Sequence, residues 1–275
     1  MSVSERTAVA SERLPGPDYG KKFAQICSAV WPQVFGFVTL FMAWHIASVY
    51  IVKSVLFPPP GDMFVRAWEL TKDGTLLPQI GISLRRIMLG FALGSILGIP
   101  IGLAIGSFSM VRRLLEPWTE FLRCIPSVAM ITIAVIWFGI GEESKIFLIM
   151  YTTIFIVILN TAAGVASIAP NKIRAAQCFG ANKWQIFVYV CLPATVPFIL
   201  TGMRLAMSNS FTAIVAAEMV SASEGLGVIL WNGRLYMLIT DIFVSLFCLG
   251  LLGYLTDRLF RWAIFRFAGR FSPVA

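Results

Sequence analysis

Long runs of apolar residues alternate with short polar segments along most of the 275-residue chain. An α-helix needs about 20 apolar residues to cross the hydrocarbon core of a bilayer. The runs are continuously apolar, and backbone groups in lipid need partners within the segment, so the pattern predicts helices and not a closed β-barrel. The six predicted spans are about residues 31–52, 80–106, 125–140, 146–165, 188–218 and 240–257. The third is short and begins near Pro126.

Two segments between the spans have an apolar character of their own. Residues 57–78 include three consecutive prolines at 58–60, and the residues that follow at helical spacing are Met63, Phe64, Ala67, Trp68 and Thr71. This pattern predicts a short amphipathic helix on the outer surface of the membrane. Residues 221–239 contain Gly225-Leu226-Gly227 and then further apolar side chains. That segment is too short to span the bilayer but apolar enough to dip back into it.

Charge is scarce and unevenly placed. Charged residues make up 13% of the chain, which is about half the share in a soluble domain. With the N-terminus inside, the segments 1–30, 107–124, 166–187 and 258–275 hold four, three, three and four basic residues, or 14 of the 22. Basic residues favour the cytoplasmic side of a membrane. We therefore place both termini in the cytoplasm. The net charge of +8 suits the anionic cytoplasmic face of a membrane, and we expect no nucleic acid as partner.

The second predicted span carries a glycine at every fourth position: Gly90, Gly94, Gly98, Gly102 and Gly106. On a helix these positions form one slowly drifting stripe without side chains. Such a stripe lets a neighbouring helix approach closely, which is how membrane helices associate when burial from water offers nothing. We predict a helix-packing surface here, with its neighbour either in the same chain or in another.

The chain offers little for catalysis or metal binding. Its five cysteines form no C-x-x-C pair and are interpreted as small apolar fillers. His45 is the only histidine and lies in the first span. The nearest approach to a phosphate-binding loop, residues 16–22, is one residue too short, ends in lysine and follows no strand. We therefore expect no enzyme activity, no metal and no cofactor in this chain.

The predicted cytoplasmic segment 166–187 has the pattern of two short helices. Pro170 and Asn171 favour a helix start, and Gly180 favours its end, because glycine adopts the left-handed conformation at little cost. A second helical stretch then runs into Leu192-Pro193.

This segment resembles the coupling loop of ABC importer permeases, which is known in that family as the EAA loop. The resemblance rests on Ala175-Ala176, three residues, Gly180, nine residues and then Val190-x-Leu192-Pro193. In the family the loop forms a short helix that docks in a groove on the cytoplasmic ATPase. The resemblance implies that the contact is made by Arg174, Ala175, Ala176, Gly180 and Ala181. Arg174 stands where the family often has Glu.

Further motifs resemble the nitrate, sulfonate, taurine and bicarbonate branch of this family. They follow one another over about residues 55–260: Ser83-Leu84-Arg85-Arg86, Ile125-Pro126-Ser127, Ile136-Trp137-Phe138-Gly139, Gly202-Met203-Arg204, Ala217-Glu218-Met219 and Gly225-Leu226-Gly227. The resemblance implies an all-α membrane protein of about six transmembrane helices, like a type I ABC importer permease, in the inner membrane of a bacterium.

The resemblance also implies an organisation and a set of partners. A cytoplasmic N-terminal segment (1–30) precedes the transmembrane permease domain (31–257), whose coupling loop is at about 166–187, and a basic cytoplasmic tail (258–275) follows. The expected partners are ATP-binding subunits that bind ATP and Mg, a periplasmic or lipid-anchored substrate-binding protein, and a second copy of the permease. The expected function is the permease of an ATP-driven importer that carries a small anion by alternating access. Sulfonates, taurine, nitrate, bicarbonate and thiamine-precursor-like molecules all stay open as solutes.

Polar side chains inside a predicted span are costly in lipid and are therefore functional candidates. The candidates in the fifth span are Arg204, Ser208, Asn209, Thr212 and Glu218. We predict that they line the pathway, with Arg204 near mid-membrane assisting an anion. Two alternatives stay open: Arg204 caps backbone carbonyls or pairs within the bundle, and Glu218 makes a structural hydrogen bond.

Two further questions stay open at this stage. Arg85 and Arg86 are expected near the outer mouth, where they either snorkel toward water or attract anions. The rival interpretation of the whole chain is a self-sufficient secondary transporter or channel. Such proteins often show inverted repeats and broken helices in matching halves, and no convincing internal repeat is visible in this sequence.

Overall fold

The structure is a computed structural model, and it describes residues 19–52 and 54–268. Residues 1–18, Lys53 and residues 269–275 lie outside the described part. Much of the predicted N-terminal segment and the end of the predicted basic tail are therefore not covered. The chain divides into two compact units, residues 1–60 and 61–275, and each is described by itself.

The first unit contains one long helix. α1 (Tyr19–Ile46) continues into a π-helical stretch, η2 (Ala47–Val52), and Phe35–Val52 is long and apolar enough to cross a membrane. The Ser48 hydroxyl donates a 2.6 Å hydrogen bond to the carbonyl of Phe57, which ties the following segment back to the end of the helix. This helix corresponds to the first predicted span.

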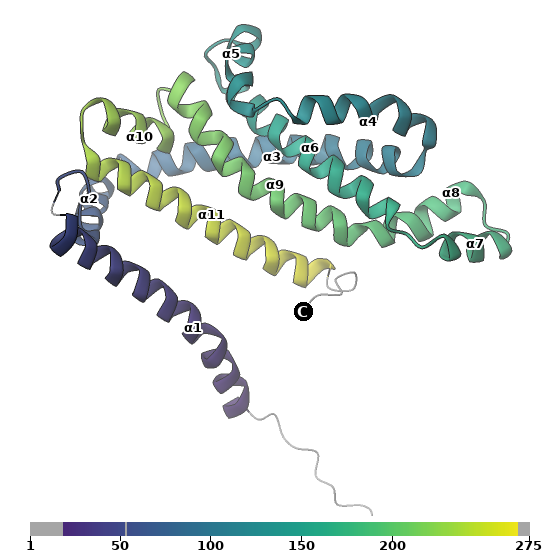
Figure 1. Ribbon diagram of the computed structural model, residues 1–275, viewed down its shortest axis with the longest axis horizontal. Helices are drawn as coiled ribbons and strands as arrows, with labels where there is room; N and C mark the ends of the chain where they lie inside the picture. Colours follow the sequence, from purple (N-terminus) through teal and green to yellow (C-terminus); the bar gives the residue numbers. More distant parts are fainter. Residues whose placement is uncertain (1–18, 53, 269–275) are drawn as a thin grey trace, which may run out of the picture. The chain divides into compact units, whose positions relative to one another are not determined.

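The second unit is a bundle of helices, and its described residues contain no strand. Its elements in chain order are α2 (Pro60–Lys72), α3 (Leu76–Ser107), α4 (Ser109–Arg123), α5 (Ser127–Phe138), α6 (Glu142–Ala166), α7 (Pro170–Cys178), α8 (Lys183–Ile186), η3 (Phe187–Cys191), α9 (Leu192–Ser221), α10 (Leu226–Leu235) and α11 (Ile239–Ala268). In Figure 1, α3, α6, α9 and α11 lie side by side, with α7 and α8 at one end of this unit and α10 at the other.

The third predicted span is the one that the structure changes. Four stretches of this unit are long and apolar enough to cross a membrane: Leu76–Ser107, Glu142–Ala166, Lys183–Ser221 and Ile239–Ile264. α4 and α5 pass the same test only as a pair bent by 99°. α5 alone has 12 residues, which cover about 18 Å. The span predicted at 125–140 is therefore the second half of a bent helix pair and not a straight separate helix, and the segment 107–124, which the sequence analysis placed between spans, is largely helical.

Pro126 explains the bend between α4 and α5. A residue that precedes proline is disfavoured in the helical conformation, so α4 ends before Ile125, and Pro126 becomes the cap of α5 with φ −59° and ψ 134°. α4 then returns beside the other helices, where its Leu122 carbonyl accepts a 2.6 Å hydrogen bond from the Tyr151 hydroxyl of α6. The segment 107–124, expected between two spans, thus contains the first half of a broken helix pair.

The glycine stripe of α3 packs against α6 in the same chain. A Cβ atom built on Gly90 would stand 2.5 Å from the Cβ of Ile149, and one built on Gly94 would stand 2.6 Å from that of Thr153. The pattern repeats to the end of α3, where Gly98, Gly102 and Gly106 face Val157, Thr161 and Val165. The residues of α6 in this seam are all β-branched and also recur every fourth position. Each glycine therefore accommodates a stiff side chain of fixed rotamer.

α9 covers another face of α6 by the same means. Gly164 of α6 faces Phe198 of α9, and Gly202 of α9 faces Asn160 of α6, with Cβ approaches of 2.6 Å in both cases. The hydroxyls of Thr153 and Ser210 lie 3.2 Å apart in the buried interface. Helices α3, α6 and α9 thus form one closely packed block.

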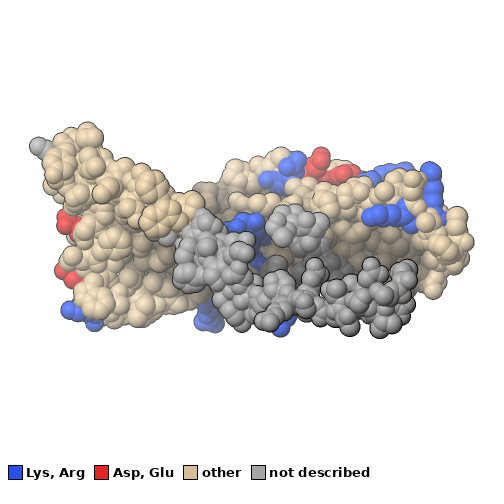
Figure 2. Space-filling view, turned by 90° about the horizontal axis from the view of Figure 1, so that it is seen from below, with Lys and Arg blue, Asp and Glu red and all other residues tan. Residues whose placement is uncertain are grey.

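α2 and α11 complete this unit. The Arg66 guanidinium donates to both carboxylate oxygens of Asp241, at 2.7 and 3.2 Å, and these hydrogen bonds raise the pKa of Arg66. Met63 is fully buried, so the predicted amphipathic helix of 57–78 packs on protein with one face. α11 continues to Ala268, past the predicted end of the last span at 257. On the face shown in Figure 2, lysines and arginines gather toward the end formed by α7 and α8.

Candidate functional site

The segment between α6 and α9 forms a tip of two short helices. α7 closes in a Schellman motif, in which the Ala181 N–H donates to the Ala176 carbonyl (3.1 Å) and the Gly180 N–H donates to the Gln177 carbonyl (2.9 Å). Gly180 has φ +78°, and no atom lies within 4 Å of where its Cβ would stand. A side chain would therefore find room at this position, and glycine is favoured because of the left-handed backbone conformation.

The second helix of the tip has a defined start and runs on toward α9. The Asn182 side chain accepts from the Gln185 N–H and the Gln185 side chain accepts from the Asn182 N–H, both at 2.8 Å. This reciprocal capping box fixes the N-terminus of α8. α8, η3 and α9 follow one another without a break, so a force on the tip passes directly into α9.

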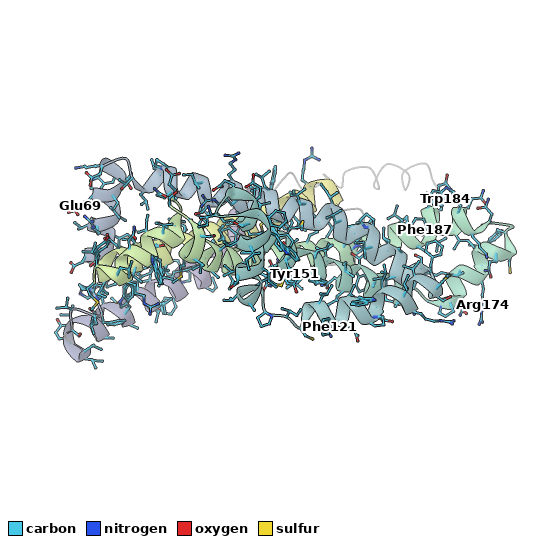
Figure 3. The ribbon with its side chains drawn as sticks, turned by 90° about the horizontal axis from the view of Figure 1, so that it is seen from above. Glu69, Phe121, Tyr151, Arg174, Trp184 and Phe187 are labelled. Carbon is cyan, nitrogen blue, oxygen red and sulfur yellow. The ribbon has the colours of Figure 1, made fainter. Side chains whose placement is uncertain are left out.

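The tip presents aromatic side chains to its surroundings. No residue of α7 is buried, Phe179 is 89% exposed, and Trp184 is 71% exposed. Trp184 stacks on Phe187 with ring centroids 5.6 Å apart, and Figure 3 shows Trp184 and Arg174 at opposite edges of the tip. Large exposed apolar groups of this kind mark an interaction surface.

A buried ion network lies near the opposite end of the bundle. This outer ion network consists of Ser83, Arg86, Glu142, Lys145 and Glu218. Arg86 donates to Glu218 at 2.7 Å and to both oxygens of Glu142 at 2.6 and 2.8 Å, while Lys145 lies 3.0 Å from Glu142. The side chains of Arg86 and Glu218 are 3% and 0% exposed. The network joins α3, α6 and α9 at one level.

The outer ion network also holds the turn that precedes α10. Glu218 accepts hydrogen bonds from the Ser83 hydroxyl and the Gly227 N–H, both at 2.8 Å. The Ser83 hydroxyl accepts from the Leu226 N–H at 2.9 Å, and Gln79 accepts from the Gly225 N–H. A Cβ on Gly225 would meet the Glu218 carboxylate, and the residue has φ +127°. The Gly-Leu-Gly sequence is therefore required by this carboxylate and by this turn.

A second group of charges lies near the middle of α9 and α11. This central ion cluster consists of Arg204, Asp257 and Arg261. Arg204 donates to Asp257 at 2.6 and 3.3 Å, and Arg261 donates to the second Asp257 oxygen at 2.7 Å. The side chains of Arg204, Asp257 and Arg261 are 44%, 19% and 45% exposed. Arg204 lies 14 residues before Glu218, or about 21 Å along the helix axis.

The central ion cluster opens into a cleft of about 450 Å³ between α9 and α11. Thr201, Ser208 and Tyr254 line this cleft beside Arg204 and Asp257. Thr201, Arg204, Ser208 and Thr212 are all exposed and recur every three or four positions along α9. These residues define the polar stripe of α9. Asn209 lies beside the stripe, and its amide donates to the Leu205 carbonyl at 3.0 Å.

The family model for binding-protein-dependent transport system inner membrane components matches residues 90–269 of this chain. The chain belongs to that family. The matched range contains the tip, the whole central ion cluster, and Glu142, Lys145 and Glu218 of the outer ion network. The permease is accordingly a multi-pass membrane component of a transport system, and the self-sufficient secondary transporter is set aside.

Curated relatives agree with this assignment. The permease is 40% identical over 220 residues to a probable ABC transporter permease protein of Brucella melitensis, covering 80% of this chain and 89% of the relative. It is 33% identical over 225 residues to the taurine transport system permease protein of Escherichia coli (strain K12), covering 80% and 82%. ATP hydrolysis in such systems is performed by a separate subunit, and the permease is not an enzyme.

The fold also has a counterpart among solved structures. The permease superposes on a chain of the MetNI methionine ABC transporter, solved in an inward-facing conformation, with a TM-score of 0.62 and 17% sequence identity. The match covers 74% of this chain and 98% of that chain. The all-α architecture predicted from sequence, similar to an ABC importer permease, is confirmed.

The structure separates the residues that sequence reasoning had grouped on the fifth span. Arg204, Ser208 and Thr212 share the polar stripe of α9, and Arg204 pairs within the bundle as one alternative stated. Glu218 is 1% exposed and fully hydrogen-bonded, so no solute reaches it in this conformation. Arg86 is buried and paired, and the expectation that it snorkels or stands open to anions is wrong.

Sequence reasoning missed the partners of these residues. Asp257 and Arg261 were assigned to the end of the last span and to the tail, and Ser83 and Glu142 were given no role. A signal for Asp257 was present, because a single carboxylate at the end of an apolar run needs a basic partner. Nothing in the sequence showed which arginine that partner would be.

Proposed function

We propose that two copies of the permease, related by two-fold symmetry, form the pathway of an importer for a small anion of the sulfonate type. The polar stripe of α9 carries this proposal. Exposed polar side chains on a spanning helix are costly against lipid, and a surface facing a second copy and a shared aqueous pathway removes that cost. Arg204 and the relationship to a taurine permease support an anionic solute.

The residues of the fifth predicted span that we keep in the pathway surface are Arg204, Ser208, Asn209 and Thr212. Glu218 is left out because it is buried in the outer ion network. Thr201 joins the pathway surface because it continues the same exposed stripe toward the tip.

The proposed contact with the ATP-binding subunit is the tip, with Arg174, Ala175, Ala176, Gly180 and Ala181 at its centre. The Schellman turn at Gly180 fixes the angle between α7 and α8, and the exposed aromatic groups beside it supply apolar contact area. The ATP-binding subunits hold ATP and Mg, and their closure draws two tips together. Since the tip joins α6 to α9, that movement shifts the α3–α6–α9 block and changes the side to which the pathway opens.

The experiment compares two glycines that occupy the same kind of turn. Gly74 closes α2 in a Schellman motif like that of Gly180, with the Thr75 N–H on the Leu70 carbonyl at 3.1 Å. Its φ is +71°, and no atom lies within 4 Å of its Cβ position. Gly180→Asp and Gly74→Asp therefore impose the same backbone strain, but only the first lies on the tip.

Both variants are assembled with the ATPase and the binding protein in proteoliposomes, and uptake of radiolabelled taurine is measured together with ATP hydrolysis. We expect Gly180→Asp to abolish ATP-driven uptake while Gly74→Asp retains most of it. Equal uptake by the two variants, in complexes of equal composition, would overturn the role of the tip. A preparation that transports taurine without ATPase subunits would overturn the proposed importer.

A further inference from the structure

The central ion cluster has one carboxylate for two guanidinium groups. Arg204 reaches Asp257 through a short bond of 2.6 Å and a long one of 3.3 Å. Arg261, one helical turn beyond Asp257, holds the second oxygen at 2.7 Å. Asp257 therefore keeps a cationic partner on its own helix if Arg204 releases it. The cluster carries a net charge of +1 and its positive excess lies beside the cleft.

Arg204 has hydrogen-bonding capacity left over. Its Nε and Nη2 donate to Asp257, whereas Nη1 donates to no residue in the described part of the chain. Its side chain is 44% exposed. The Ser208 side chain, one helical turn along α9, lines the same cleft and has no hydrogen-bond partner among residues 54–268. A guanidinium edge and a hydroxyl thus converge on one space of about 450 Å³.

We propose that this cleft is an anion subsite in which Asp257 is the resident counter-ion. The sulfonate or carboxylate group of a passing solute takes the place of Asp257 on Arg204, and Asp257 stays paired with Arg261. This inference rests on the proposed function, because it takes the polar stripe of α9 as the pathway surface. The inference adds to that function the Asp257 carboxylate, which competes with the solute for Arg204.

The exchange has a physical reason. An unpaired guanidinium within the membrane is costly, so the empty subsite needs an internal anion. Guanidinium binds planar and tetrahedral oxyanions through paired N–H donors, so a sulfonate can replace the carboxylate as the partner of Arg204, and its charge neutralises the net +1 of the cluster. The subsite therefore releases its solute when Asp257 returns. A cationic solute would compete for Asp257 and gain nothing from the open Nη1 group.

The experiment measures the local potential through a thiol in the cleft. Ser208→Cys is placed in a background whose native cysteines are serine, and the chain is assembled with its ATPase in liposomes. The rates of modification by methanethiosulfonate ethylsulfonate, an anion, and by the ethyltrimethylammonium reagent, a cation, are compared. We expect the anion-to-cation rate ratio to rise roughly tenfold in Asp257→Asn and to fall by a similar factor in Arg204→Gln, since each change alters one charge in the cleft that the thiol lines.

Two controls keep the result specific. Asp257→Glu retains the carboxylate and should leave the ratio within about twofold of the parent. Thr212→Cys lies one turn farther along the same stripe, and its ratio should respond much less to Asp257→Asn. Ethanesulfonate, added as the displacing anion, should protect the Ser208→Cys thiol from the anionic reagent, whereas choline should not.

The outcomes separate the subsite from the proposed function. The subsite is overturned if the anion-to-cation rate ratio is unchanged by both Asp257→Asn and Arg204→Gln in intact complexes. It is also overturned if ethanesulfonate does not protect the thiol. If Asp257→Asn fails to assemble, Arg204→Gln and the protection assay decide the matter alone. ATP-driven uptake that is lost in Gly180→Asp and kept in Gly74→Asp preserves the proposed function even where the subsite fails.

Discussion

The outer ion network and the central ion cluster use the same residue types in opposite surroundings. Arg86 and Glu218 are 3% and 0% exposed, and both carboxylate oxygens of Glu218 accept hydrogen bonds from α3 or from the first turn of α10. Arg204 and Arg261 are close to half exposed and share one carboxylate. The first arrangement leaves no room for an exchange of partners, and the second does.

The difference shows that burial and satisfaction of donors, more than the charge itself, separate a structural ion pair from an exchangeable one. Removing one partner of a buried pair leaves an uncompensated charge and is strongly destabilising, whereas an exposed pair contributes little to stability. The same substitution should therefore damage folding at the outer ion network and function at the central ion cluster.

Arg86→Met should give the largest effect on stability. It leaves Glu218 buried beside Ser83 without its guanidinium, which costs about 3–5 kcal/mol. The measurement is the thermal unfolding midpoint of the purified complex in detergent. Arg85→Met is the matched control, because Arg85 is the exposed neighbour on the same helix and its replacement should stay within about 0.5 kcal/mol.

A second variant sharpens that result. Combining Arg86→Met with Glu218→Gln removes both charges and should recover part of the loss. If Arg86→Met unfolds at the same temperature as Arg85→Met, the outer ion network is not structural.

Gly94→Ala tests whether the helix seam holds the outer ion network together. The new Cβ would stand 2.6 Å from the Cβ of Thr153, so α3 and α6 must separate, at a cost of about 1–3 kcal/mol. Gly81→Ala on the same helix has open space and should be neutral or slightly stabilising, because alanine favours the helix. A midpoint for Gly94→Ala that matches Gly81→Ala would contradict the seam.

Arg204→Gln should have a small effect on stability and a large effect on transport, unlike Arg86→Met. Its effect on unfolding should stay below about 1 kcal/mol, as for an exposed pair. ATP-driven taurine uptake should fall roughly tenfold, which is the loss expected when a charge-assisted hydrogen bond to the solute is removed. Wild-type uptake in a normally assembled complex would remove Arg204 from the pathway.

Salt should give the smallest effect and act on one region only. Raising the ionic strength from about 0.1 to 1 M shortens the screening length from about 10 to 3 Å. The few tenths of a kcal/mol that Arg261→Gln costs at low salt should vanish at high salt, because Arg261 is exposed. The deficit of Arg86→Met should not change. Unfolding midpoints recorded at both salt concentrations check this. An equal salt response in the two variants would contradict the difference in burial between the central ion cluster and the outer ion network.

Much of the helix arrangement followed from local pattern. The long helices α1, α3, α6, α9 and α11 and the amphipathic helix after the three prolines were each indicated by apolar runs and by the prolines, glycines and charged residues between them. The broken pair α4 and α5 was not foreseen, because the charged residues of 107–124 resemble a cytoplasmic loop and the sequence does not show that Pro126 bends a helix that lies against Tyr151.

The sequence by itself determined that this chain is helical, spans a membrane and carries a permease-like tip, because hydrophobic length, glycine spacing and the residues around Gly180 are local properties. Only the tertiary structure decided which charges meet. Arg86 and Glu218 are 132 residues apart, and Arg204 and Asp257 are 53 apart, so their pairing depends on how the helices are stacked. Whether each pair is buried or exposed depends on the same stacking, and it decides which of the two we expect to exchange partners.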